Sequence, residues 1–354
     1  MKPLAYLSLS LLVLAMAGCQ KPEMEKTAKQ ETPPPTRIAP QQDDTRCLNL
    51  AEQMQKINSE STVEALDQVN AQIKTCLPQL KFEQQKQILK ASNAMYQRFL
   101  TVKRTPEQQT AFEDYAFNQS PHPTLQQSYT EKFSPRDQYL LKHQGKVYYE
   151  LYDGGEGMFS YRRQPQYLAQ IFAPYLPTAE RIFIEKLASQ NQQSPLRDGA
   201  LTISWDEIAQ RAQFWENYVK QYPNSSFIDD ARLLLSLYTS FLFKGMNNTP
   251  ISDTYTGELS IRPDALTVIQ QVAKQRDSEL AAQSKRFLEF VEMSPAQRNQ
   301  KIKVQLTAPE RLSGQENILT LRQLEKYVQL RDPYANSPRD QYRDCFSDAV
   351  CISY

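Results

Sequence analysis

Apolar residues follow three different patterns along this chain, and each pattern predicts a different kind of structure. Residues 4–17 form a mostly apolar stretch behind a single basic residue, Lys2. A stretch of this length falls short of the roughly 20 residues of a membrane-spanning helix and is typical of the removable core of a secretory signal. Residues 21–44 are rich in Lys, Glu, Gln, Thr and Pro and nearly free of apolar side chains. Such a segment cannot bury enough apolar surface to offset its ordering entropy, so we expect a disordered tether.

From residue 46 onward, apolar residues recur every three or four positions, which predicts amphipathic helices. We expect two helices between Cys47 and Cys76, broken near residues 58–61, and a third helix over residues 82–102. Further helix starts are marked by a capping hydroxyl before a proline at the first helical position. These hydroxyl residues are Thr105, Ser134, Ser294 and Ser337.

Between residues 146 and 163 the pattern changes to alternation. Val147, Tyr149 and Leu151 alternate with other residues, and a glycine-rich segment, 153–157, follows them. This arrangement predicts a β-hairpin or two extended arms around a tight loop.

Glycine usage agrees with a helical chain, because only 9 glycines occur in 354 residues and helices avoid this residue. We therefore predict a mainly α fold, either helical-repeat-like or an irregular helical bundle, with one short β-hairpin. The expected organisation is a signal over residues 1–18, a tether over 19–45, an N-terminal helical region over 46–145, and the hairpin plus a second helical region over 146–354.

The charge balance narrows the classes of partner. Lys and Arg number 41 and Asp and Glu number 40, which leaves a formal net charge of +1. No overall field favours nucleic acid or an anionic surface, so we expect no nucleic-acid partner.

Residues 14–19, Leu-Ala-Met-Ala-Gly-Cys, resemble the end of a bacterial lipoprotein signal. The resemblance implies cleavage before Cys19, a diacylglycerol on its sulfur and a third acyl chain on its amine, with Met16 replacing the usual leucine. Gln20 stands where an aspartate would imply retention in the inner membrane, so the resemblance implies an anchor on the periplasmic face of the outer membrane. The alternatives are an ordinary secreted protein with an incidental cysteine and a buried N-terminal strand.

Residues 205–243 resemble one tetratricopeptide-type unit of periplasmic lipoproteins. A helix ends in Tyr-Pro-Asn-Ser at residues 222–225, and a second helix carries an early small residue, Ala231. Residues 264–275 and 278–292 fit another helix pair, but its spacing does not match a 34-residue repeat. The resemblance implies a helical-repeat-like α domain rather than a regular solenoid.

Four cysteines remain once Cys19 is set aside, and an oxidising periplasm favours pairing them. If the two helices between Cys47 and Cys76 are antiparallel and similar in length, these two cysteines meet. Cys345 and Cys351 are then left to pin the C-terminal tail. Metal binding is the competing interpretation, but the chain has no Cys-x-x-Cys pair and its two histidines stand apart from the cysteines.

Aromatic, acidic and arginine residues gather around the expected hairpin. Aromatic faces beside an acidic loop and two guanidinium groups could hold a glycan or a peptide. The same aromatic residues could instead be cross-strand partners that close the hairpin on the helices. The candidate binding residues are Tyr149, Tyr152, Asp153, Glu156, Tyr161, Arg162 and Arg163.

No sequence motif indicates catalysis or a cofactor. A Gly-x-Ser-x-Gly elbow, a phosphate loop and a metal-binding histidine pair are all missing from the sequence. We read His122 as a loop residue, His143 as a helix cap, and Asp229 and Asp230 as solvated residues at a helix start. We therefore expect a non-enzymatic envelope scaffold for another envelope protein. The alternative is a lipoprotein that binds or cleaves peptidoglycan.

Overall fold

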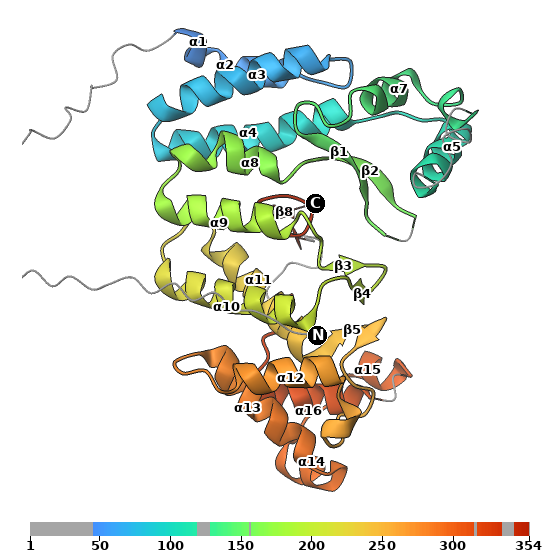
Figure 1. The fold of residues 1–354 in the computed structure, drawn as a ribbon, viewed down its shortest axis with the longest axis vertical. Helices are drawn as coiled ribbons and strands as arrows, with labels where there is room; N and C mark the ends of the chain where they lie inside the picture. Colours follow the sequence, from blue (N-terminus) through green and yellow to red (C-terminus); the bar gives the residue numbers. More distant parts are fainter. Residues whose placement is uncertain (1–44, 119–127, 156, 315–316, 335–342, 354) are drawn as a thin grey trace, which may run out of the picture. The chain divides into compact units, whose positions relative to one another are not determined.

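The computed structural model describes residues 45–118, 128–155, 157–314, 317–334 and 343–353, and residues 43–354 belong to one compact unit. The described residues are mainly helical, and each sheet among them has only two strands (Figure 1). The predicted mainly α fold is confirmed. Residues 1–44, for which the signal, the acylated Cys19 and the tether are predicted, lie outside the described residues.

The N-terminal helices follow the predicted pattern. They are α1 (Thr45–Leu48), α2 (Leu50–Lys56), α3 (Val63–Cys76), the 3-10 turn η1 (Leu77–Gln79) and α4 (Phe82–Leu100). The predicted break precedes α3, where the Thr62 side chain accepts a hydrogen bond from the Ala65 amide at 3.2 Å. The Cys47–Cys76 disulfide joins α1 to the end of α3 with a Cα–Cα distance of 5.6 Å, which confirms the predicted pairing.

Helices α5 (Pro106–Phe117) and α7 (Pro135–Lys142) begin at two of the expected hydroxyl-proline signals. The predicted hairpin follows as strands β1 (Tyr149–Asp153) and β2 (Phe159–Arg163). These strands pair antiparallel, with Tyr149 opposite Arg163 and Asp153 opposite Phe159.

Along the middle of the chain, a hairpin is followed by helices three times over. The hairpin β1–β2 precedes α8 (Gln166–Ile171), the 3-10 turn η2 (Ala173–Tyr175) and α9 (Thr178–Gln190). Strands β3 (Leu196–Arg197) and β4 (Ala200–Leu201) precede α10 (Trp205–Gln221) and α11 (Ile228–Lys244). Strands β5 (Gly245–Met246) and β6 (Thr249–Pro250) precede the 3-10 turn η3 (Glu258–Ser260), α12 (Pro263–Val272) and α13 (Glu279–Glu292). Both predicted helix pairs are confirmed, whereas the second and third hairpins were not predicted.

The hairpin tips contact one another along one side of the helices (right in Figure 1). The Asn248 amide donates to the Gly199 carbonyl at 3.0 Å, which joins the third tip to the second. The first tip meets the second at Gly155, where an added Cβ would lie 2.7 Å from Oδ1 of Asp198. Gly155 also has φ of +87°, so both its backbone and its neighbour require glycine there.

Two buried carboxylates connect successive helix pairs. Glu180 on α9 accepts the Ser226 amide at 2.9 Å, just before α11. Glu216 on α10 accepts the amide of Glu279 at 2.6 Å, at the start of α13. Glu216 therefore satisfies a backbone N–H group that a helix start leaves without an intrahelical partner, and Glu180 satisfies one in the turn before α11.

The chain ends with α14 (Pro295–Lys301), α15 (Ala308–Leu312), α16 (Ile318–Val328) and the short strands β7 (Arg343–Asp344) and β8 (Ile352–Ser353). The last two strands do not stay with α16. They return to the middle of the unit, beside α9 and the first hairpin (Figure 1). None of the helices in the described ranges combines the length and apolarity that crossing a bilayer requires.

Candidate binding site

A pocket of about 360 Å³ lies where the first hairpin, helix α4 and the C-terminal segment meet. Four of the predicted binding residues line this pocket: Tyr152, Tyr161, Arg162 and Arg163. The hairpin thus brings together more than half of the proposed set. The opposite walls come from α4 and from residues 344–352, which the sequence did not connect with the hairpin.

Arg163 is buried and holds the C-terminal segment in place. Its Nε and Nη2 atoms donate to Oδ2 of Asp348 at 3.1 and 2.7 Å. Its Nη1 and Nη2 atoms also donate to Ser92 at 3.1 Å and to Asn93 at 2.5 Å, both on α4. Through these contacts Arg163 links β2, α4 and the C-terminal segment. Removing either member of a buried charge pair leaves the other uncompensated, so this role of Arg163 is structural.

Arg162 faces the pocket and keeps a small exposed area. Its Nε atom donates to Oε1 of Glu150 at 2.8 Å, and its Nη1 atom donates to the Ser347 carbonyl at 3.2 Å. Its guanidinium carbon lies 3.8 Å from the ring centroid of Tyr152, in cation–π contact. Arg162 therefore orders the pocket wall that Tyr152 forms.

Tyr149 and Tyr161 belong to the core. The Tyr149 hydroxyl donates to the Leu140 carbonyl at 2.6 Å, and the Tyr161 hydroxyl donates to Oδ1 of Asp137 at 3.2 Å. Burial raises the pKa of both phenols well above the ordinary value, so both stay protonated donors. These two residues fit the cross-strand packing alternative better than direct ligand binding.

Asp153 lies at the hairpin tip, away from the pocket lining. Its Oδ1 atom accepts the Gly155 amide at 2.9 Å, and its Oδ2 atom lies 3.7 Å from Nη2 of Arg197 in the second hairpin. Asp153 therefore helps to join two hairpin tips. Glu156, the remaining candidate, lies outside the described residues.

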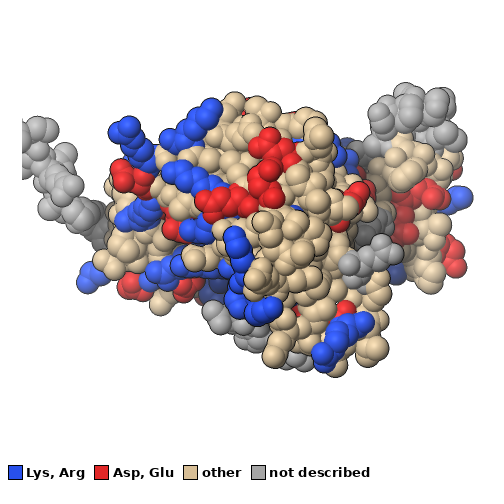
Figure 2. All heavy atoms as spheres, turned by 90° about the horizontal axis from the view of Figure 1, so that it is seen from below, with Lys and Arg blue, Asp and Glu red and all other residues tan. Residues whose placement is uncertain are grey.

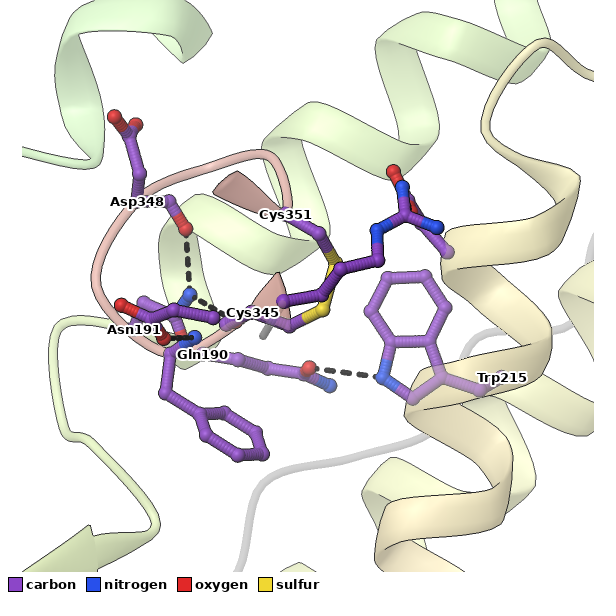
Figure 3. The surroundings of a disulfide bond; sticks show 10 residues. Gln190, Asn191, Trp215, Cys345, Asp348 and Cys351 are labelled. Atoms are coloured by element: carbon purple, nitrogen blue, oxygen red, sulfur yellow. Dashed lines mark hydrogen bonds and ion pairs between the residues drawn. A yellow bond between two sulfur atoms is a disulfide. The ribbon is translucent and has the colours of Figure 1, made fainter. Parts of the chain in front are cut away.

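The C-terminal disulfide loop, drawn in Figure 3, contributes Ser347 and Asp348 to the pocket lining. The predicted Cys345–Cys351 bond is present, with a Cα–Cα distance of 4.1 Å. The side-chain amide of Asn191, at the end of α9, donates to the carbonyls of Cys345 at 2.9 Å and Asp348 at 2.5 Å. Beside it, Trp215 donates from its indole nitrogen to Oε1 of Gln190 at 3.0 Å (Figure 3). The loop is thus seated on α9 as well as on the hairpin.

The prediction for Asp229 and Asp230 is half wrong. Asp229 is exposed and pairs with Arg232 at 3.1 Å, as expected for a solvated helix start. Asp230 is buried and forms an ion pair with Arg343, in the C-terminal segment. Burial raises the pKa of Asp230 to about 6, although Arg343 acts in the opposite direction. The sequence could not show this, because the partner lies more than a hundred residues away.

Asp137 and Asp348 were not singled out from the sequence, although both support the site. Asp137 accepts Nε and Nη2 of Arg104 at 2.9 and 2.7 Å and lies beneath Tyr161. A local signal in the sequence points to Asp137, because it lies three residues after Ser134. The Ser134 hydroxyl caps α7 by accepting the Asp137 amide at 3.1 Å. Asp348 carries no local signal, because its role depends on a distant arginine.

The two histidines were predicted to be a loop residue, His122, and a helix cap, His143. His143 places Nδ1 2.8 Å from the Tyr139 carbonyl at the end of α7, which confirms its predicted role as a helix cap. His122 lies outside the described residues. Within the described ranges, no group of three or more His, Cys, Asp or Glu side chains could hold a metal ion.

Comparisons with known proteins found no relative from which a role of the pocket could be inferred. No protein-family model, curated protein or solved structure matches this chain.

Proposed function

We propose that this chain is a lipid-anchored envelope protein whose helical body faces the periplasm from the outer membrane and binds another envelope protein. The observation that carries the proposal is the use of its cysteines. Four of them form two disulfides, Cys47–Cys76 and Cys345–Cys351, and the fifth, Cys19, ends the lipoprotein-like signal. Disulfides form and persist mainly in oxidising compartments, and such a compartment is where a lipoprotein signal would send the chain.

The arrangement of the helices supports a scaffold role. Stacked helix pairs present extended surfaces on which another protein can dock. The tip of the first hairpin adds one exposed apolar side chain, Met158, which has 62% of its surface accessible. On the face seen from below in Figure 2, Lys and Arg side chains are interspersed with Asp and Glu. This mixture favours specific contacts with a protein over a general affinity for polyanions.

A photo-crosslinking amino acid at Met158 tests the scaffold role in intact cells. We expect one specific protein to be captured at this position, because Met158 is an exposed apolar side chain at the tip of the first hairpin. The same crosslinker at Gln68, which is exposed on α3, is the matched control and should not capture that protein. If Met158 captures nothing that Gln68 does not, docking at the hairpin is wrong.

A second candidate function is binding of peptidoglycan. The observation that favours it is the pocket lining, in which side-chain amides and hydroxyls stand beside Tyr152. Cleavage is less well supported, since Asp348 is engaged by Arg163 and Glu150 by Arg162. Incubation of the protein with purified sacculi separates the two roles, because release of muropeptides requires an enzyme.

A further inference from the structure

Two further pockets adjoin the one beside the hairpin. The second, of about 390 Å³, shares Arg162 with the first. The third, of about 620 Å³, shares Gln192 with the second and reaches the start of α10 at Ser204. We call these three adjoining pockets the groove. It runs from α4 and the C-terminal segment, past the hairpin and the start of α8, to the end of α9 and the start of α10.

The charged side chains that line the groove are already matched. Each of the three arginines pairs with a carboxylate at an N–O distance of 2.8 Å or less. The pairs are Arg162 with Glu150, Arg163 with Asp348, and Arg211 with Glu207. The further carboxylate, Asp344, accepts the Phe346 amide at 2.7 Å. The described lining therefore offers no unpaired cation to a phosphate, sulfate or carboxylate group, which argues against an anionic ligand.

The rest of the lining is mostly side-chain amides and hydroxyls. Among them, the amides of Gln97, Gln166 and Gln192 and the hydroxyl of Ser160 make no hydrogen bond to another described residue. One comes from α4, one from α8, one follows α9 and one lies on β2. A glutamine amide offers two donors and an acceptor, so these groups can bind a ligand rich in hydroxyl or amide groups.

Two tyrosines supply flat surfaces in the same groove. Tyr152 lines the first pocket and Tyr148 lines the second. The hydroxyl of Tyr148 donates to Oε1 of Gln170 at 3.1 Å, which fixes its ring. An aromatic ring beside side-chain amides can contact the C–H face of a pyranose while the amides bind its substituents.

The backbone is strained where Tyr148 joins the groove. Val147 and Tyr148 have φ of +43° and +60°, a region that is costly for a β-branched residue such as valine. The Tyr96 hydroxyl donates to the Val147 carbonyl at 2.7 Å and helps to hold this conformation. Strain of this kind gathers at binding sites, where it presets a side chain.

We propose that the groove binds an uncharged glycan strand. The sugar rings lie against Tyr148 and Tyr152. The hydroxyl or acetamido groups of the sugars form hydrogen bonds with the side-chain amides of Gln97, Gln166 and Gln192. The inference rests on the proposed function only for location, because an envelope protein would meet such strands. An extended peptide fits less well. Peptides are recognised by pairing with a strand edge or by apolar pockets for their side chains, and apolar side chains are few in this lining.

Titration calorimetry with oligomers of β-1,4-linked N-acetylglucosamine tests the proposal. The mature full chain would be used in a detergent without a sugar headgroup, so that the detergent cannot compete. We expect the hexasaccharide to bind at least about tenfold more tightly than the disaccharide, since it can occupy adjoining pockets. Affinity should not fall when the ionic strength is raised, because the ligand is uncharged.

Substitutions then locate the site. Gln97→Ala and Gln192→Ala should each weaken hexasaccharide binding by about threefold or more, by removal of a ligand hydrogen bond. Gln68→Ala, on an exposed face of α3 outside the groove, should leave it unchanged. Thermal unfolding of each variant checks that the fold is retained.

Three results would overturn the proposal. They are no binding of the hexasaccharide, equal binding by the groove variants and the wild type, and binding of an uncharged peptide such as N-acetylated, C-amidated hexaglycine in its place. None of them bears on the anchor, since acylation of Cys19 is measured separately. Conversely, an unmodified Cys19 would contradict the proposed location while leaving glycan binding in solution intact.

Discussion

At the scale of single residues, a buried charge pair holds the candidate site together. Arg163 on β2 and Asp348 in the C-terminal segment are 185 positions apart in sequence, and their side chains are only 3% and 5% exposed. Local periodicity placed Arg163 in a hairpin but could not reveal its partner. The helix caps, in contrast, could be predicted, because Thr105 and Ser134 accept hydrogen bonds from amides three positions away.

Removing the acidic partner should be costly. We expect Asp348→Ala to lower the free energy of unfolding by about 3 kcal/mol, because it leaves a buried guanidinium uncompensated. Asp229→Ala removes an exposed carboxylate of similar size and should cost less than about 0.5 kcal/mol. Urea denaturation of both variants makes the comparison. Equal stabilities would mean that the Arg163–Asp348 pair does not hold the C-terminal segment.

Asp230 gives a pH-dependent prediction. Burial raises the pKa of Asp230 in the folded chain to about 6, from an ordinary value of 3.8. Between these values the folded state retains a proton that the unfolded state has lost, so this group makes stability fall as pH rises. The contribution is about 1.4 kcal/mol per pH unit in that window.

Asp230→Asn removes this contribution. The unfolding free energy of the variant should therefore fall less, or rise more, than that of the wild type between about pH 4 and about pH 6. Glu292→Gln, an exposed carboxyl change on α13, is the control and should follow the wild type. Parallel curves for Asp230→Asn and the wild type would contradict the assignment.

At the scale of elements, helices were predicted well and the smaller hairpins were not. The periodicity over residues 82–102 corresponds to α4, which ends at Leu100. The hairpin β3–β4 turns at Asp198 and Gly199, which have φ of +50° and +66°. An Asp-Gly pair, whose residues readily take positive φ, is a strong local hairpin signal. The flanking strands have only two residues each, which is too short to show an alternation of apolar and polar residues.

Glycine substitutions at the first hairpin tip separate two physical effects. Gly155 and Gly157 both have positive φ, +87° and +74°, but only Gly155 lies against another element. Gly157→Ala should cost about 1 kcal/mol, through backbone strain alone. Gly155→Ala should cost more, because its Cβ would also collide with Asp198.

The double variant Gly155→Ala/Asp198→Gly removes the side-chain part of that collision and should recover some of the stability. Thermal unfolding of the three variants and the wild type measures both effects. Equal losses at Gly155 and Gly157 would show that the tips do not press on one another.

At the scale of the whole molecule, the return of the C-terminal segment could not be predicted. Residues 343–353 leave α16 and contact α9, α11 and the first hairpin, through Asn191, Asp230 and Arg163. Such contacts depend on the arrangement of all the helices, which no local pattern encodes. The Cys47–Cys76 bond was predictable because the two cysteines flank a pair of neighbouring helices, and Cys345–Cys351 followed as the remaining pair.

The disulfides should differ in what they contribute. Cys47 and Cys76 are separated by 29 positions and Cys345 and Cys351 by 6. In the chain-entropy account, replacing the first pair by alanines should cost about 3.6 kcal/mol and replacing the second about 2.2 kcal/mol. Denaturation under non-reducing conditions compares them. No loss of stability in Cys47→Ala/Cys76→Ala would contradict a structural role for that bond.

The central claim is that a lipid on Cys19 holds this helical body to a membrane in the envelope. Mass spectrometry of the mature N-terminus from native membranes tests it most directly. The account predicts a chain that begins at Cys19 and carries a diacylglycerol and an amide-linked acyl chain. A chain recovered with Cys19 unmodified, or with residues 1–18 still attached, would contradict it.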